Sequence, residues 1–261
     1  MSRSRRWLIL FALVLGNLGL TLLVLLLLSP PPEAEERTLL TLFQRSIVDA
    51  QPSREGRVYD HLFALSPRNS KLQWEERDQE QWVRVVTWQS SRTVAQYYQP
   101  AQEAQTRVKA GDHLLWVTLV PQLQNFCRAL ARDIDPDFRL KQYLGLNPDR
   151  RYERFVELLV RPEQIFRPCP DPDPADSRCE LEMNLASPPQ VSGIDNYNLW
   201  FAELKRTSYQ PQGAPWTRLG YTYDWRYGQW GVGASEYVLT PDAEYYVIAN
   251  YSTDEYCGFA P

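Results

Sequence analysis

The chain has 261 residues, a formal net charge of −4 and a high aromatic content that includes 9 tryptophans and 15 tyrosines. This length allows one large or two small domains with a hydrophobic core, so folding does not require a structural metal. The acidic balance argues against nucleic acid as a partner, because phosphate recognition requires a basic surface.

An uncharged apolar run opens the chain at residues 7–28, and only Asn17 and Thr21 in it are polar. A helix of these residues extends about 33 Å, which is enough to cross the core of a bilayer. Arginines precede the run and glutamates follow it. The positive-inside rule therefore places residues 1–6 in the cytoplasm as a basic tail, and the C-terminal part outside.

The run is longer than the apolar core of a signal peptide, and no Ala-x-Ala cleavage site follows it. We therefore expect an uncleaved, single-pass signal anchor in the lipid bilayer of the plasma membrane. The Pro- and Glu-rich segment 29–36 predicts a stiff spacer. Residues 37–261 are then expected to form one extracytoplasmic domain.

That domain begins with an amphipathic helix at 37–50, in which apolar residues recur at helical spacing. β-Branched and aromatic residues predict a hairpin of strands 81–88 and 93–98, followed by a strand at 113–120. Pro121 suits the first position of a helix. Asp135 and Pro136 predict the start of a second helix, which ends at Gly145.

The rest of the domain alternates strands, loops and one helix. Residues 152–161 are apolar on both faces, which predicts a central strand. The other predicted elements are a turn at 162–166, an irregular loop at 167–179, a helix at 195–206 and strands at 218–225, 232–239 and 243–248. This order predicts an α+β fold, with an antiparallel sheet and helices on one face.

Four cysteines, Cys127, Cys169, Cys179 and Cys257, all follow the apolar run. An even number in an oxidising compartment suggests two disulfides, for which three pairings are possible. A bond between Cys169 and Cys179 closes a short loop easily, which leaves Cys127 for Cys257. A zinc site is disfavoured because there is no Cys-x-x-Cys motif.

The candidate motifs for catalysis and metal binding each lack a feature that the chemistry requires. A nucleophilic pair of Cys127 and His113 would need an exposed thiol, whereas the helical pattern buries Cys127. Asp171, Asp173 and Asp176 fall short of a calcium loop, which requires a ligand at position 5 and a glycine at position 6. The sequence therefore predicts a structural loop there, with no metal and no cofactor.

The last predicted hairpin joins strands 218–225 and 232–239. Its expected register sets six pairs opposite each other: Trp225–Val232, Tyr223–Ala234, Thr222–Ser235, Tyr221–Glu236, Gly220–Tyr237 and Leu219–Val238. Glu236 is then the only charge on an aromatic face, and a local pattern broken without a gain in folding marks function or strain. We therefore hypothesise a binding site lined by Glu236, Tyr221, Tyr223, Trp225 and Arg218.

The alternative for Glu236 is a structural role. A buried carboxylate must find donors or stay protonated, because burying it unpaired is expensive. The Tyr221 hydroxyl or a nearby arginine could supply the donor.

Three segments, 114–123, 155–172 and 215–225, resemble a family of bacterial envelope proteins that are secreted or attached to a membrane. The likeness spans about residues 114–257. It implies one extracytoplasmic domain with paired cysteines and no particular catalytic residue. We expect binding or scaffolding at the bacterial envelope, with an envelope polymer or a protein as partner. The alternative is a carboxylate-dependent hydrolase or transferase acting on envelope polysaccharide or peptidoglycan.

Overall fold

The computed structural model describes residues 32–111, 114–228 and 230–259. The predicted basic tail and signal anchor, residues 1–28, lie outside them. No helix in the described ranges is long and apolar enough to cross a membrane. The chain divides into two units, Met1–Thr41 and Leu42–Pro261.

The first described helix, α2, runs over Pro32–Ala50. It therefore starts inside the segment 29–36 that was predicted to be a stiff spacer, earlier than the helix predicted for residues 37–50. Proline suits the first turn of a helix, because the missing N–H has no intrahelical partner there.

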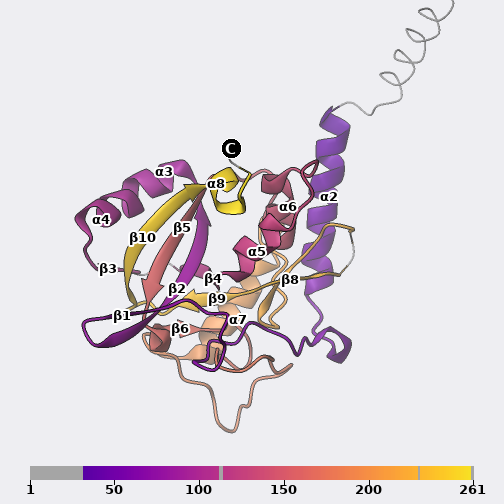
Figure 1. The fold of residues 1–261 in the computed structure, drawn as a ribbon. Helices are drawn as coiled ribbons and strands as arrows, with labels where there is room; N and C mark the ends of the chain where they lie inside the picture. The colour runs from indigo at the N-terminus through magenta and orange to yellow at the C-terminus, as the bar shows by residue number, and fades with distance from the viewer. Residues whose placement is uncertain (1–31, 112–113, 229, 260–261) are drawn as a thin grey trace, which may run out of the picture. The chain divides into compact units, whose positions relative to one another are not determined.

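The Leu42–Pro261 unit is built on one large antiparallel sheet with the strand order β3-β10-β5-β2-β4-β9-β6, in which β1 also pairs with β2 (Figure 1). A small second sheet pairs β7 with β8. The strands are β1 (Trp74–Arg77), β2 (Glu80–Gln89), β3 (Val108–Lys109), β4 (Trp116–Leu119), β5 (Arg154–Val160), β6 (Ile165–Phe166), β7 (Tyr221–Tyr223), β8 (Val232–Ser235), β9 (Tyr237–Leu239) and β10 (Glu244–Ser252).

Short helices connect these strands. They are η1 (Glu55–Arg57), α3 (Ser91–Thr93), η2 (Val94–Tyr98), α4 (Gln99–Ala104), α5 (Gln122–Arg128), α6 (Pro136–Tyr143), η3 (Pro162–Gln164), α7 (Tyr197–Ser208) and α8 (Thr253–Cys257). The α+β class and the antiparallel sheet are thus confirmed.

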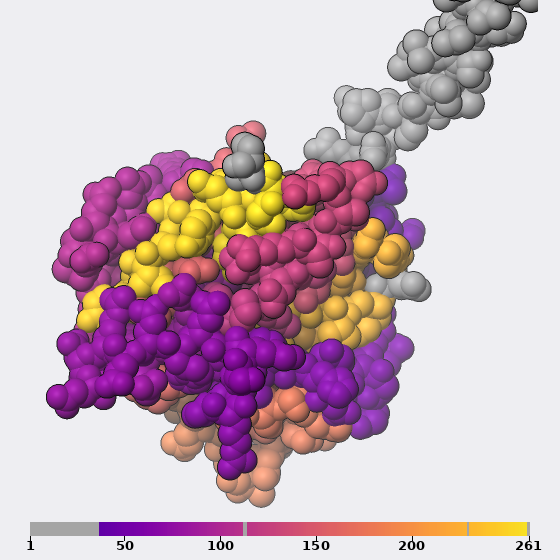
Figure 2. Space-filling model, viewed as in Figure 1, coloured from indigo at the N-terminus to yellow at the C-terminus, as the bar shows by residue number. Residues whose placement is uncertain are grey.

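Helices cover both faces of the large sheet, so the prediction of helices on one face is wrong. Val85 and Val156 pack on one side with η2 and α4. Val86 and Phe155 pack on the other with α5, α6 and α8. Successive strand residues point to opposite faces, and β2 and β5 are apolar on both, so both faces must be covered. Figures 1 and 2 show α8 beside α5 and α6 on the second face.

The predicted strand at 93–98 is instead helical, as part of the run α3, η2 and α4. The Ser90 side chain accepts a hydrogen bond from the Thr93 N–H and caps the helix. Val94, Tyr98 and Ala101 recur at helical spacing and are buried against the sheet. Tertiary burial therefore overrides the β propensity of this segment. The hairpin partner of β2 is β1, which precedes it.

Other sequence predictions hold. β5 lies between β10 and β2, so the predicted central strand is confirmed. The Asp135 side chain accepts hydrogen bonds from two backbone N–H groups at the start of α6, as expected of a cap. The helix predicted to begin at Asp195 is capped one residue later, by Asn196, and runs to Ser208.

The predicted register of the last hairpin is wrong. Tyr221 pairs with Ser235 and Tyr223 with Val232, with an irregularity between them. The Thr222 hydroxyl donates to the Tyr143 carbonyl oxygen at 2.6 Å and accepts from the Ala234 N–H at 2.9 Å. This contact with the end of α6 distorts the hairpin, and a local pairing rule cannot include it. The predicted strand 232–239 is also broken, since β9 belongs to the large sheet.

Gly233 is the residue that allows the hairpin to approach the end of α6 so closely. A Cβ atom added there would lie 2.2 Å from both the Thr222 hydroxyl oxygen and the Tyr143 carbonyl oxygen. We expect Gly233→Ala to lower the free energy of unfolding by about 2 kcal/mol, as overpacking does. Denaturant unfolding measures this loss. Gly56→Ala, where a Cβ atom meets nothing within 4 Å, is the control, and equal losses in the two variants would contradict the expectation.

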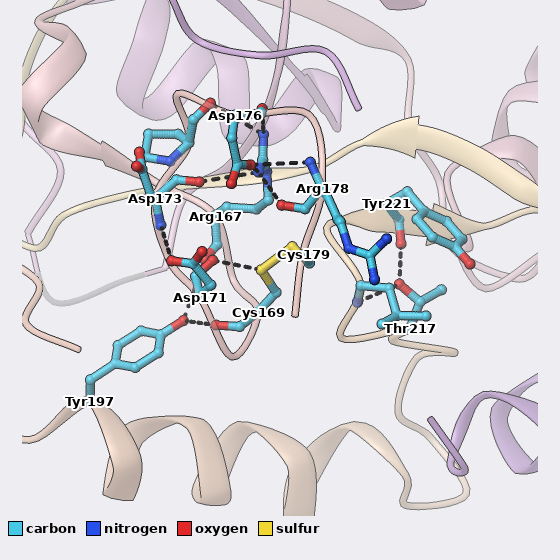
Figure 3. Close-up of a disulfide and its surroundings, with 12 residues drawn as sticks. Arg167, Cys169, Asp171, Asp173, Asp176, Arg178, Cys179, Tyr197, Thr217 and Tyr221 are labelled. Carbon is cyan, nitrogen blue, oxygen red and sulfur yellow. Dashed lines mark hydrogen bonds and ion pairs between the residues drawn. A yellow bond between two sulfur atoms is a disulfide. The ribbon is translucent and has the colours of Figure 1, made fainter. Parts of the chain in front are cut away.

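Both predicted disulfides are formed, Cys127–Cys257 and Cys169–Cys179. The first joins α5 to α8 and leaves Cys127 no free thiol, which rules out its use as a nucleophile in this structure. The second closes the loop 167–179 around the buried guanidinium of Arg167 (Figure 3). The carboxylates of that loop cap backbone N–H groups or pair with arginine, as expected of a structural loop.

Alkylation tests the disulfides directly. We expect a thiol reagent to label no cysteine of freshly isolated, unfolded protein unless a reductant is added first, and all four after reduction. Mass spectrometry counts the labels. Four labels without reductant would contradict both pairings.

Candidate functional site

A cavity of about 440 Å³ lies between β2 and β4 of the large sheet and the segments that lead into β7 and β9. This volume is within the range of small-molecule binding sites. Its walls are mainly apolar and aromatic, and they include Trp88, Trp116, Leu123, Leu144, Leu146, Tyr152, Pro215, Trp216 and Tyr223. The polar side chains on its walls include Thr118, Arg150 and Glu236.

Glu236 stands where the chain leaves the small sheet and enters the large one, between β8 and β9. Its backbone N–H donates to the Gly220 carbonyl oxygen at 3.0 Å, which fixes its position. Only 6% of the residue is exposed, and its Oε1 atom has no hydrogen-bond partner in the described part of the chain. A buried acceptor without a partner is rare in folded proteins and calls for an explanation.

Burial raises the pKa of Glu236 to about 8, and the indole of Trp216 offsets part of this rise. The indole N–H lies near the carboxyl group without reaching hydrogen-bond geometry, since both Nε1 of Trp216 and Oε1 of Glu236 remain unpaired among the described residues. At neutral pH the carboxyl group is therefore mostly protonated. In that state it can both donate and accept a hydrogen bond.

Two further buried polar atoms on the cavity residues lack partners within the described ranges, Oγ1 of Thr118 and Nε1 of Trp88. Thr118 is 6% exposed and Trp88 is 5% exposed. Four of the thirteen buried side-chain atoms that lack a partner in the described ranges therefore belong to residues of the cavity lining. All four atoms are themselves covered by protein.

Two of the five residues predicted for a binding site, Glu236 and Tyr223, line this cavity. The Tyr223 hydroxyl donates to the Asp49 carboxylate at 2.8 Å, so only its ring is available to a ligand.

The other three residues do not line the cavity. The Tyr221 hydroxyl donates to the Arg57 carbonyl oxygen at 2.5 Å, and Arg218 binds the Tyr209 hydroxyl at 2.8 Å. Neither side chain supplies the donor that we expected for Glu236. Trp225 is fully buried, with its ring edge-on to Phe43 and to Phe138.

Sequence reasoning missed the sheet side of the cavity. Trp88, Trp116 and Thr118 come from β2 and β4, more than 100 positions before Glu236 in the sequence. One signal was available: Thr118 is a polar residue inside the apolar run 114–120. It breaks the local pattern in the same way as Glu236.

In residues 32–111, 114–228 and 230–259, no group of three or more His, Cys, Asp or Glu side chains is placed to hold a metal ion. His113, one half of the nucleophile pair considered above, lies outside these ranges.

Comparisons of the chain with protein-family models, with curated proteins and with solved structures find no match.

Proposed function

We propose that this protein is a ligand-binding protein of the bacterial envelope and that the Glu236 cavity is its binding site. In this proposal residues 7–28 anchor the chain in the plasma membrane and the C-terminal unit lies outside the cytoplasm. The two disulfides support an oxidising compartment. The ligand is a small molecule, or the end of an envelope polymer, that fits a cavity of about 440 Å³.

The Glu236 carboxyl group on the wall of a mainly apolar cavity is the observation that supports binding most strongly. Burial raises its pKa to about 8, and ionisable groups with perturbed pKa values cluster at functional sites. Sites of this kind combine an apolar lining with a few convergent polar groups.

The enzymatic alternative receives less support from the same geometry. Enzymes that cleave glycosidic bonds with carboxylates use two of them, on either side of the bond. Glu236 is the only carboxylate among the described residues that line the cavity. A single neutral carboxyl group suits recognition of a ligand better than a two-carboxylate reaction.

Screening tests the binding site. The full-length protein in detergent micelles is exposed to a library of uncharged, cationic and anionic small molecules, and saturation-transfer NMR detects binding. Each hit is repeated with Ala214→Trp, because Ala214 is exposed at the cavity and a larger side chain there narrows its mouth. Ala186→Trp, at an exposed position outside the cavity lining, is the control.

Hits that Ala214→Trp removes and Ala186→Trp retains support the proposal. Hits that both variants retain, or a screen without any hit, contradict it.

The topology is tested separately. A periplasmic reporter enzyme fused after Pro261 should be active, and protease added to intact spheroplasts should digest the fused domain, because the charges around residues 7–28 place the N-terminus inside. A C-terminus that is protected from protease in intact spheroplasts, and is digested only after lysis, would show the opposite orientation.

A further inference from the structure

Several apolar side chains of the cavity lining are only partly buried. Leu114 is 38% exposed, and Trp116, Leu144, Leu146 and Tyr152 are half-buried. Their apolar surface is open to a molecule that enters the cavity, whereas the polar atoms of the lining that lack partners are covered by protein. Removing such surface from water favours binding. The cavity therefore suits a ligand with an apolar body.

Contacts within the fold hold two of these apolar side chains in place. The Tyr152 ring stacks on Trp88 with the ring centroids 5.3 Å apart. Trp116 lies in β4 and pairs with Val238 of β9. The apolar surface is thus formed before a ligand enters, so binding orders few protein side chains.

Arg150 adds a positive charge to this apolar lining. It is the only cationic residue among the described residues of the lining, and it is exposed. Its side chain makes no hydrogen bond or ion pair within residues 32–111, 114–228 and 230–259. By contrast, Arg57, Arg84 and Arg139 all pair with a carboxylate of this protein. The Arg150 guanidinium therefore keeps its donors available to a ligand.

The backbone around Arg150 is fixed beside the cavity. The Arg150 N–H donates to the Asn147 carbonyl oxygen at 3.2 Å, and the Glu153 N–H donates to the Gln89 carbonyl oxygen at 2.9 Å. The Glu153 carboxylate also accepts from the Ser91 N–H at 2.9 Å. These bonds hold the segment 147–153 against the end of β2, which lines the cavity. A ligand therefore has only the Arg150 side chain to order.

No ionised carboxylate among the described lining residues opposes an anion at neutral pH. Glu236 is the only acidic residue of that lining, and it is mostly protonated because burial raises its pKa to about 8. A cation in the cavity meets repulsion from Arg150, and an uncharged ligand leaves the guanidinium without a charged partner. The charges of the lining therefore favour a negative group.

We propose that the cavity binds a small carboxylate with an apolar body, whose carboxylate pairs with Arg150 while its ring or short alkyl chain packs on the apolar side chains. This inference rests on the proposed binding function and names its ligand class. A guanidinium group matches a carboxylate with two parallel hydrogen bonds. The volume of about 440 Å³ lies in the lower part of the range for small-molecule sites and is too small for a two-chain phospholipid. The ligand therefore comes from the aqueous phase.

Sets of small molecules that share an apolar body and differ in the head group test the ligand class. One set is 3-phenylpropionate, 3-phenylpropanamide and 3-phenylpropylamine; the other is hexanoate, hexanamide and hexylamine. Saturation-transfer NMR titrations measure binding to the full-length protein in detergent micelles, and binding that Ala214→Trp retains is subtracted as uptake by the micelle. We expect the better carboxylate to bind at least about fivefold more tightly than its own amide and amine, as an ion pair allows.

Two neighbouring arginines separate pairing at the cavity from a general effect of charge. Arg150→Gln removes the positive charge from the lining, so the carboxylate should bind no more tightly than its amide. Binding of the amide should stay within about twofold of the wild type, which shows that the cavity is intact. Arg151→Gln is the matched control, because Arg151 is exposed and lies outside the lining. It should keep the preference for the carboxylate.

Several results would overturn the inference. An amide or amine that binds as tightly as its carboxylate does so, and so does a preference that survives in Arg150→Gln or disappears equally in Arg151→Gln. Equal losses of amide and carboxylate binding in Arg150→Gln would show that Arg150 shapes the cavity without pairing with the anion, which also contradicts it.

Failure of the inference is distinguishable from failure of the proposed function. If no carboxylate binds while the library screen gives hits that Ala214→Trp removes, the ligand class is wrong and the proposed function stands. If the screen fails too, both are wrong.

Discussion

Glu236→Gln is expected to make the protein more stable than the wild type at pH 8 and to differ from it much less at pH 4.5. The pKa of this carboxyl group rises from 4.5 in the unfolded chain to about 8 in the folded protein. Between these values the unfolded chain releases the proton and the folded protein keeps it. The free energy of unfolding therefore falls as pH increases, by up to about 5 kcal/mol for this group.

The direction of this pH dependence follows from the number of protons that the folded and unfolded states bind. Below pH 4.5 both states are protonated, so the contribution of Glu236 is fully present. It is lost as the pH rises toward about 8, and above that value both states are ionised and the slope disappears. A glutamine side chain does not titrate, so the Glu236→Gln variant should lack this slope.

Denaturant unfolding of both proteins from pH 4.5 to pH 9 measures the difference between the two stability curves. The difference isolates Glu236, because every other titrating group is common to both proteins. Glu163→Gln is the control, since 65% of that side chain is exposed, and its curve should parallel the wild type. Parallel curves for Glu236→Gln as well would show that the buried carboxyl group does not carry a raised pKa.

Arg167→Met should lower the free energy of unfolding by about 3 kcal/mol, because several carbonyl oxygens of the loop lose their donor and each acceptor left unpaired inside the protein costs about 1–3 kcal/mol. The Arg167 side chain is fully buried. It donates to the Asp176 carboxylate at 2.6 Å and to the carbonyl oxygens of Asp173, Pro174, Asp176 and Arg178. Methionine keeps much of the volume and supplies no donor, so these acceptors lose their partner.

Arg178→Met is the matched control, because it makes the same change eleven residues away in the same loop (Figure 3). Arg178 pairs with Asp60 and Glu55, but 41% of its side chain is exposed. Exposed ion pairs contribute about 0–1 kcal/mol. Chemical denaturation with both disulfides intact gives the two losses. Losses of the same size would show that the loop does not depend on its buried guanidinium.

Features set by neighbouring residues could be predicted from the sequence. Asp135 and Pro136 are neighbours that together predict the start of a helix, and the structure places the start of α6 there. The short spacing of Cys169 and Cys179 favours their pairing, and with four cysteines this choice leaves Cys127 for Cys257. The apolar residues on both faces of 152–161 identify a strand with neighbours on either side.

The same strand also bears on where the helices lie. A sheet whose central strands are apolar on both faces needs cover on both faces, yet we predicted helices on one. The helical segment 93–98 covers part of one face of the sheet, opposite the face that α5, α6 and α8 cover. Its β-branched and aromatic residues suggested a strand, and Val94 and Tyr98 lie four positions apart as in a helix.

The candidate site could be predicted only in part. Glu236 was recognisable because it is a charged residue in an aromatic, strand-forming segment, and the structure leaves its Oε1 atom unpaired among the described residues. Its expected partners were wrong, because they came from a register in which Tyr221 faces Glu236. The Thr222 hydroxyl, held by Tyr143 at the end of α6, gives the hairpin another register.

By itself the sequence determined the local features of this protein: where helices start, which strand is central, which loop a disulfide closes and which acidic residue is out of place. Periodicity and capping act over a few residues and can be recognised in the chain. Only the tertiary structure decided what surrounds Glu236. Thr118 and Trp88 reach the cavity through pairing between strands that are distant in sequence, and such pairing depends on the packing of the whole unit.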